Sequence, residues 1–176
     1  MFVDKEEIGS EGNTGMQSCF LEDTVIELMD RMQKFSAVGL RRALRNSKAL
    51  SADVEAALDP TFKDVHDPLN AAKLGYGVVI TKFTGHGGKY NANDAHAEFV
   101  GEVRRIFDKH NVPWQVAELG KVDMGGGGTV AKFMARYNMD VLDCGPALLS
   151  MHSPFEIASK ADVYASFLAY HAFFEP

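Results

Sequence analysis

The segment Gly77-Val-Val-Ile-Thr-Lys-Phe83 is the clearest β-strand of the chain, because it is rich in β-branched residues and follows a glycine. Beyond it we predict a helix from Asn93 or Asp94, either of which can cap it, to about His110. Residues 112–119 are then predicted to form a second strand. The apolar residues of the helix recur at three- and four-residue spacing: Phe99, Val103, Ile106 and Phe107. This strand–helix–strand order is typical of a layered α/β fold.

The same alternation extends from this unit in both directions. Further strands are predicted at 1–4, 48–53 and 139–143. Further helices are predicted at 22–35, at 40–46 after a break at Gly39, at 130–137 and at about 156–174. Loops are expected at 6–15, 85–90 and 145–154, where glycine, serine and proline gather. Residues 1–176 are therefore expected to form one α/β domain with a mostly parallel sheet.

Composition narrows the possible partners. The 176 residues carry a formal net charge of −6, whereas nucleic-acid binding needs a basic face, so no nucleic-acid partner is expected. No apolar run approaches the roughly 20 residues of a membrane-spanning helix, so we expect no membrane partner. Cys19 and Cys144 form no motif, which favours free thiols in a reducing compartment. The N-terminus lacks the shape of a signal peptide, and we expect a cytoplasmic protein.

Residues that could bind a metal follow several predicted strands. Glu6 and Glu7 follow the first strand, Asp53 ends the next, and His152 lies in the loop after 139–143. Functional residues of such sheets collect beyond the carboxyl ends of strands, so this shared placement indicates a site. Of two adjacent carboxylates, one can bind a cation while the other accepts a proton from metal-bound water. Each of these residues also has a plainer interpretation when taken alone. Glu6 and Glu7 could form a solvated acidic turn, Asp53 could be a turn or N-cap residue, and His152 could be a surface histidine.

Two further features could contact a substrate. The run Gly125-Gly-Gly-Gly-Thr129 precedes a predicted helix, and its backbone N–H groups could bind an anion. A flexible connector is the plainer interpretation, and a phosphate loop is disfavoured because no Gly-Lys-Ser/Thr ending follows. Lys82, in the clearest strand, could anchor a substrate carboxylate, although an exposed strand lysine is commoner.

Three motifs in register give the chain a resemblance to a known family. Asp4-Lys5-Glu6-Glu7-Ile8-Gly9-Ser10, Ser51-Ala52-Asp53, and Ser150-Met151-His152-Ser153 with Glu156 resemble, in this order, three motifs of the M18 metalloaminopeptidases. This is the aspartyl aminopeptidase and aminopeptidase I group, and the resemblance covers essentially the whole chain. The glycine run and Asp143-Cys144-Gly145-Pro146 are most similar to the bacterial branch.

The resemblance implies a fold, a reaction and roles for individual residues. It implies a three-layer α/β/α sandwich of the zinc-exopeptidase type and removal of N-terminal residues from peptides by water activated between two metal ions. Zinc is the implied cofactor, with cobalt or manganese as alternatives. Glu6 would be the general base and acid, Glu7 and His152 would bind one metal, and Asp53 the other. Lys82, Gly127, Gly128 and Thr129 are weaker candidates for substrate contacts. The resemblance also implies a homo-oligomer.

The chain departs from the family pattern in two places. Family members carry a histidine ligand and a bridging aspartate upstream of the acidic pair, so this chain is expected to be the C-terminal part of the catalytic domain, truncated at its N-terminus. Alone it would have little or no activity, and a separate N-terminal half is a possible partner. Many members have Asp-x-x-His after the aspartate that matches Asp53, whereas Val54-Glu55-Ala56-Ala57 stands here. The alternatives are a non-catalytic metal-binding or assembly subunit and a phosphate- or nucleotide-binding protein.

Overall fold

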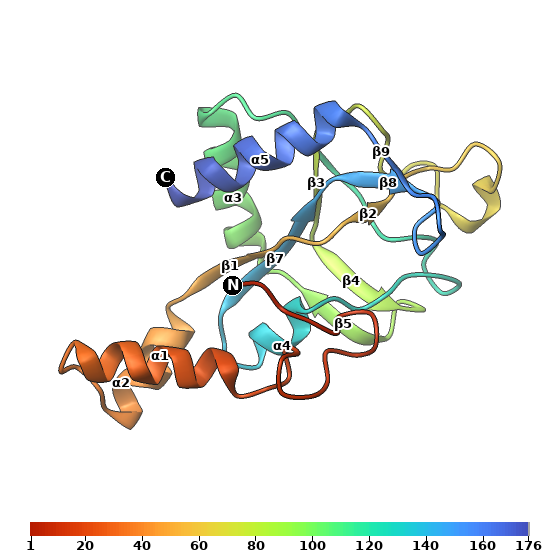
Figure 1. Cartoon of the computed structure of the whole chain (residues 1–176). Coiled ribbons are helices and arrows are strands. Elements are labelled where there is room, and N and C mark those ends of the chain that lie inside the picture. The colour runs from red at the N-terminus through yellow and green to blue at the C-terminus, as the bar shows by residue number, and fades with distance from the viewer. Residues whose placement is uncertain (176) are drawn as a thin grey trace.

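The central sheet has four strands in the order β1-β7-β3-β6. These are β1 (Lys48–Ser51), β7 (Asp140–Gly145), β3 (Val78–Thr81) and β6 (Trp114–Val116). A computed structural model describes residues 1–175. β1 is parallel to β7 and β3 to β6, but β3 and β7 are antiparallel (Figure 1). The sheet is therefore mixed: two of its three strand pairings are parallel, as expected, and the pairing of β3 with β7 is antiparallel.

The reversal between β3 and β7 has its origin in the segment that leads into β7. The chain between β6 and β7 carries only a short helix, α4 (Ala131–Ala135), which packs on β7 and on the hairpin strand β5 (Tyr90–Asp94). Because β6 is parallel to β3 and β7 is antiparallel to it, the chain reverses its direction relative to the sheet within this segment.

Two helices cover one face of the sheet. α3 (Ala97–Lys109) and α5 (Lys160–Phe174) pack against each other and against β3 and β7 (Figure 1). The predicted apolar stripe of α3 is buried there, together with Val78 and Ile80 of β3 and Leu142 and Cys144 of β7. Because side chains alternate along a strand, Asp143 points to the other face of the sheet.

On that other face, polar residues occupy neighbouring strands. Ser51 pairs with Asp143 across β1 and β7, and Thr81 pairs with Asp143 across β3 and β7. Paired residues project on the same side of a sheet. The side chain of Thr81 reaches Glu55 of β2 (Glu55–Ala56). We call Ser51, Asp143, Thr81 and Glu55 the buried oxygen row, because all four are at most 4% exposed.

Smaller elements surround the sheet. β2 pairs with β8 (Ala147–Leu149), which pairs with β9 (Ile157–Ala158). A hairpin joins β4 (Phe83–His86) to β5, and a short 3-10 helix, η1, spans Lys63–Val65. α1 (Phe20–Arg31) and α2 (Ala37–Arg45) form a pair that projects from the body of the protein (Figure 1). α1 has no buried residue.

The structure differs from several of the predicted elements. No strand forms at 1–4, where Phe2 is fully exposed and the chain enters a hydrogen-bonded loop. The predicted loop at 85–90 contains parts of β4 and β5, and the loop at 145–154 contains β8. α3 starts at Ala97, because Asn93 and Asp94 belong to β5 and cap nothing. No helix within residues 1–175 is long and apolar enough to cross a membrane.

Candidate metal and hydrolytic site

The acidic pair sits on a loop, residues 4–17, that is held by its own hydrogen bonds; we call it the acidic loop. Lys5 Nζ donates to Thr14 Oγ1 over 2.8 Å, and the backbone N–H of Ser10 donates to the carbonyl of Lys5 over 2.7 Å. A Cβ at Gly15 would lie 2.1 Å from the Ser10 carbonyl oxygen, so this close approach requires glycine. The loop thereby presents Glu6 half-buried and Glu7 exposed.

His152 lies on a tight turn between β8 and β9. Ser150 and His152 both have positive φ angles, of 59° and 65°, which non-glycine residues seldom adopt. The Glu156 carboxylate stabilises the turn by accepting a hydrogen bond of 2.7 Å from the backbone N–H of His152. Unusual backbone of this kind is frequent at functional sites, where surrounding contacts maintain it. Glu156 therefore fixes the backbone of His152 and, through it, the direction of the imidazole side chain.

The acidic loop and the histidine turn meet although they come from opposite ends of the chain. His152 Nε2 lies 3.0 Å from Glu7 Oε2, and both side chains are about two-thirds exposed. Asp53 follows β1, and its Oδ1 accepts the backbone N–H of Val54 over 2.8 Å. The backbone of Asp53 packs against Gly145, where a Cβ would lie 1.8 Å from the Asp53 carbonyl oxygen. The predicted pair of ligands, Glu7 and His152, is therefore in contact.

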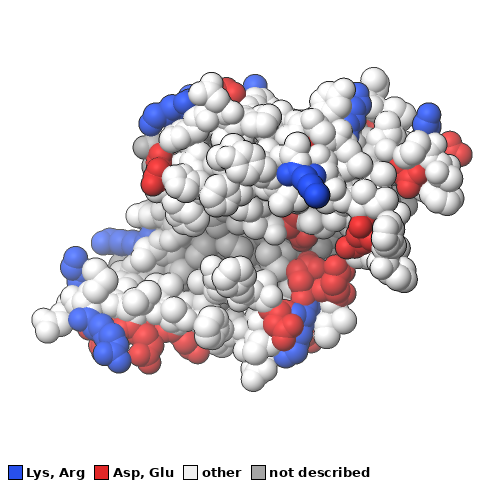
Figure 2. Space-filling view, turned by 45° about the horizontal axis from the view of Figure 1, so that its top comes forward, with Lys and Arg blue, Asp and Glu red and all other residues white. Residues whose placement is uncertain are grey.

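A groove of about 650 Å³ runs from these residues along β1. Glu6, Glu7 and Asp53 line its polar end, and apolar side chains line the rest, among them Met1, Phe2, Leu50, Met134 and Phe173. Figure 2 shows a face of the protein that is hollowed in this way, with acidic side chains gathered to one side of the hollow. The three candidate carboxylates therefore share one opening.

The surroundings of Glu6 suit a group that exchanges protons. Burial raises the pKa of its carboxyl first, and the negative charges of Asp53 and Glu7 raise it further. Lys132 and His152 act in the opposite direction. Burial likewise raises the pKa of Asp53, and the charge of Glu7 adds to this. A carboxylate with a raised pKa is a better general base near neutral pH than an ordinary glutamate.

The weaker substrate candidates lie away from the groove lining. Lys82 forms an ion pair with Asp94 of β5. Gly128 lies against the hairpin, since a Cβ there would be 2.5 Å from the Asn91 carbonyl oxygen. Thr129 is buried, and its Oγ1 accepts the backbone N–H of Ala131 over 3.2 Å. Gly127 has only the Leu119 side chain near the place of a Cβ. The substrate roles of these four residues stay predictions.

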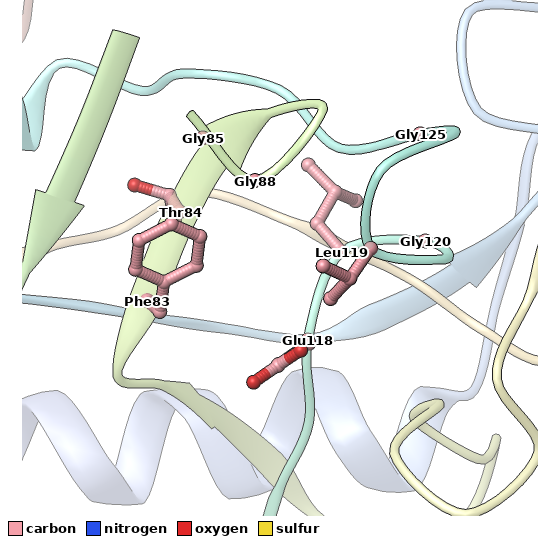
Figure 3. Close-up of a pocket in the computed structure, with 9 residues that line it drawn as sticks. Phe83, Thr84, Gly85, Gly88, Glu118, Leu119, Gly120 and Gly125 are labelled. Carbon is pink, nitrogen blue, oxygen red and sulfur yellow. The ribbon is translucent and has the colours of Figure 1, made fainter. Parts of the chain in front are cut away.

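A small cavity lies between the β4 end of the hairpin and the glycine run (Figure 3). Its walls include Phe83, Gly88, Glu118, Leu119 and Gly125. Gly126 has a φ of 91° and would carry a Cβ only 2.1 Å from the Gly85 carbonyl oxygen. Close backbone packing therefore explains at least part of the glycine run that could also have bound an anion.

Four residues near the site were missed from the sequence. Lys132 acts on Glu6, and Tyr170 lines the groove while donating a hydrogen bond of 2.8 Å to the Cys144 carbonyl oxygen. Glu55 and Asp143 are buried carboxylates close enough to Asp53 to be affected by its charge. The only signal for Asp143 was its place as the last residue of the predicted strand 139–143, since functional residues collect at the carboxyl ends of strands.

The chemical types of the candidate ligand atoms are ones that zinc accepts. Carboxylate oxygen and imidazole nitrogen are common zinc ligands, and Glu7 with His152 offers one of each at contact distance. Asp53 adds a carboxylate at the same groove. Within residues 1–175, however, no group of three or more His, Cys, Asp or Glu residues is close enough together to hold a metal ion. The arrangement is therefore a ligand pair with a further carboxylate nearby.

Comparison with known proteins agrees with this chemistry. The profile of a family described as "Aminopeptidase I zinc metalloprotease (M18)" matches residues 1–174. The chain belongs to the M18 family. A "Probable M18 family aminopeptidase 1" of Borrelia garinii is 54% identical over 175 residues, which are 98% of this chain and 38% of that protein. One from Thermotoga maritima, with the same description, is 54% identical over 177 residues, or 99% of this chain and 39% of that protein.

Solved structures of this family share the fold. The crystal structure of an M18 aminopeptidase from Thermotoga maritima has a TM-score of 0.94 at 53% identity, over 97% of this chain and 38% of that one. Aminopeptidase I from Clostridium acetobutylicum gives 0.88 at 54%, over 97% and 36%. A structure described as a yeast dodecamer, 24% identical with a TM-score of 0.76 over 98% and 36%, shares the fold. This chain spans less than two-fifths of the length of these M18 relatives.

Proposed function

We propose that this chain carries part of the hydrolytic site of a metal-dependent aminopeptidase, which removes N-terminal residues from peptides. The contact between Glu7 and His152 carries the proposal, because it joins two predicted zinc ligands from opposite ends of the sequence. Glu6 and Asp53 at the same groove support it. The family profile and the named relatives support peptidase activity as the general function.

Each residue has a distinct role in this proposal. Glu7 and His152 would hold one zinc ion and Asp53 a second, and bound zinc would supply an activated water and stabilise developing negative charge. Glu6 accepts the proton of that water and returns it to the leaving amine; its partly buried position and raised pKa suit both steps. Glu156 fixes the orientation of His152 through the backbone of the turn.

The proposal extends to the architecture and the assembly. We assign the fold to the three-layer α/β/α, zinc-exopeptidase type and the chain to the C-terminal part of a catalytic domain. We further propose that it acts in the cytoplasm. We also propose that it forms a homo-oligomer, as the structure described as a yeast dodecamer does. Since no group of three ligand residues forms within the described chain, the chain alone should be weakly active and should need an N-terminal half for full activity.

The direct test measures the metal content and the aminopeptidase activity of the same samples. The purified chain would be loaded with zinc, cobalt or manganese and assayed on aminoacyl chromogenic substrates, alone and with an N-terminal half supplied from a full-length relative. His152→Ala should lose bound zinc. His171→Ala is the matched control, because His171 is similarly exposed and lies 3.5 Å from the Glu175 carboxylate. Equal zinc content in both variants would refute the assigned ligand.

The catalytic role of Glu6 needs a separate variant. Glu6→Gln should keep zinc but lower any measured activity by roughly two orders of magnitude or more, as expected for a lost general base. Glu11→Gln, on the exposed part of the same loop, is the control and should be unaffected. If zinc binds and no combination hydrolyses peptides, the alternative of a non-catalytic metal-binding or assembly subunit gains support.

A further inference from the structure

A second group of oxygen atoms lies inside the protein, on the face of the sheet opposite the α3–α5 core. Asp143 is central to it, because its neighbours in the register are Ser51 on one side and Thr81 on the other. Thr81 Oγ1 donates a hydrogen bond of 2.6 Å to Glu55 Oε2. The buried oxygen row therefore holds two carboxylates, Asp143 and Glu55, and Thr81 neighbours the first in the register while donating to the second. None of its residues belongs to the ligand pair proposed above.

Neither carboxylate has a basic partner. Asp143 is 4% exposed and Glu55 is 3% exposed, and no ion pair within residues 1–175 includes either of them. The charges of Asp143 and Asp53 both act unfavourably on Glu55. Burying a carboxylate without a counter-charge costs several kcal/mol, so such groups are normally paired, bound to a metal or protonated.

Oxygen atoms around Asp143 also lack hydrogen-bond partners. Both carboxylate oxygens of Asp143, Ser51 Oγ and Thr84 Oγ1 are buried and make no hydrogen bond among the residues that the structure describes. The hydroxyls of Ser51, Thr84 and Thr129 are nevertheless close enough to Asp143 to favour its ionised form. In Figure 3 the Thr84 hydroxyl is directed away from Leu119, on the other side of the cavity lining.

The chemistry of these groups selects the kind of ligand. All of them are oxygen donors, carboxylate or hydroxyl, with no imidazole or thiolate among them. Hard cations such as Ca²⁺ and Mg²⁺ prefer such donors, whereas zinc is commonly bound by nitrogen or sulfur. A cation would neutralise the two buried carboxylates and satisfy the unpartnered oxygens at the same time. A bound proton would neutralise one carboxylate and leave most of those oxygens without a partner.

We propose that Asp143, Ser51, Thr84 and Glu55 form a binding site for a hard, oxygen-preferring cation, separate from the zinc ligand pair of Glu7 and His152. The site joins β1, β2, β7 and β4, so an occupied site would hold together four strands of the fold. The proposal does not depend on the proposed hydrolytic function, because it rests on other residues and has a stability readout.

The test measures cation binding by the purified chain after removal of metals. Thermal unfolding and calorimetric titration would be run at pH 8, with Ca²⁺, Mg²⁺, Na⁺ and K⁺ in separate arms. At least one of these ions should raise Tm in a concentration-dependent way. Asp143→Asn should weaken that binding by roughly tenfold or more, since it removes a charged ligand. The matched control is Asp140→Asn, on the same strand and outside the row.

Further variants distinguish the site from its neighbours and from a folding defect. Ser51→Ala and Thr84→Val keep both carboxylates and remove one oxygen each, so both should weaken binding while the chain stays folded. His152→Ala should bind the hard cation like the unmodified chain. The proposal is overturned if no ion raises Tm at pH 8, if Asp140→Asn and Asp143→Asn respond alike, or if lowering the pH alone reproduces the whole stabilisation.

Discussion

The acidic loop and the buried oxygen row both hold carboxyl groups whose pKa is raised in part by the charge of Asp53, but the two regions are built in different ways. Backbone hydrogen bonds within a loop and a tight turn fix Glu6, Glu7 and His152, whose side chains reach solvent. Strand register fixes Ser51, Asp143 and Thr81, which are buried. In the loop, charges are screened and side chains can move toward a ligand; in the sheet, each charge must be compensated where it lies.

The largest difference between the two regions should be in stability. Leu142 neighbours Asp143 on β7 and is fully buried in the core beneath α3 and α5. Leu142→Ala should lower the free energy of unfolding by about 2–5 kcal/mol, because it leaves a cavity. His152→Ala should change it by no more than about 0.5 kcal/mol, because the side chain is largely exposed. Urea unfolding would measure both, and comparable losses would contradict the comparison.

A second difference should appear in the dependence of stability on pH. Burial raises the pKa of Asp143 from 3.8 to about 6 and that of Glu55 from 4.5 to about 7. The folded state therefore binds these protons more tightly than the unfolded state. Their contribution to stability is present below pH 4 and is lost as the pH rises through the folded pKa values. For Asp143 alone the loss amounts to about 3 kcal/mol.

Unfolding measurements between pH 4 and pH 8, in buffer free of divalent ions, would test this prediction. Asp143→Asn should remove the part of the slope that falls between about pH 4 and 6, since asparagine does not titrate. Asp140→Asn, at the other end of β7, should keep the slope of the unmodified chain. Identical slopes in all three proteins would show that Asp143 is not the titrating group.

The smallest expected effect concerns the turn that carries His152. Glu156→Ala removes the acceptor for the His152 backbone N–H and should cost about 1 kcal/mol of stability. It should also weaken zinc binding by roughly tenfold or more, because the turn would no longer hold the ligand in place. Glu156→Gln retains an acceptor and should restore most of both losses. Zinc titration of the two variants would decide, and unchanged affinity in Glu156→Ala would exclude a positioning role.

The sequence was most informative where a local pattern determines a structure. The β-branched run before Lys82 correctly predicted β3, and the spacing of apolar residues from Phe99 to Phe107 correctly predicted α3. The contact of Glu7 with His152 was implied by the family motifs, since no local pattern relates two residues so far apart. Tertiary pairing decided the rest. A hairpin around Gly85 and the antiparallel β3–β7 pair depend on which strands meet, which periodicity does not encode.

The burial of Glu55 and Asp143 was also not predictable from the sequence, for the same reason. Glu55 lies two residues after Asp53, and Asp143 follows the apolar pair Val141-Leu142. The burial of both follows from strand register, and the register was not available from the sequence. Lys132 was likewise placed on a predicted helix with nothing to indicate that its charge would act on Glu6.

The contact between Glu7 and His152 has a consequence for the order in which the protein folds. Almost the whole chain separates the two residues, so closing this loop early would cost more entropy than any local contact returns. We therefore expect the sheet to assemble first and the ligand pair to form among the last native contacts. An ion that binds both side chains would act as a clasp on the finished fold. It would slow unfolding and leave the rate of folding nearly unchanged.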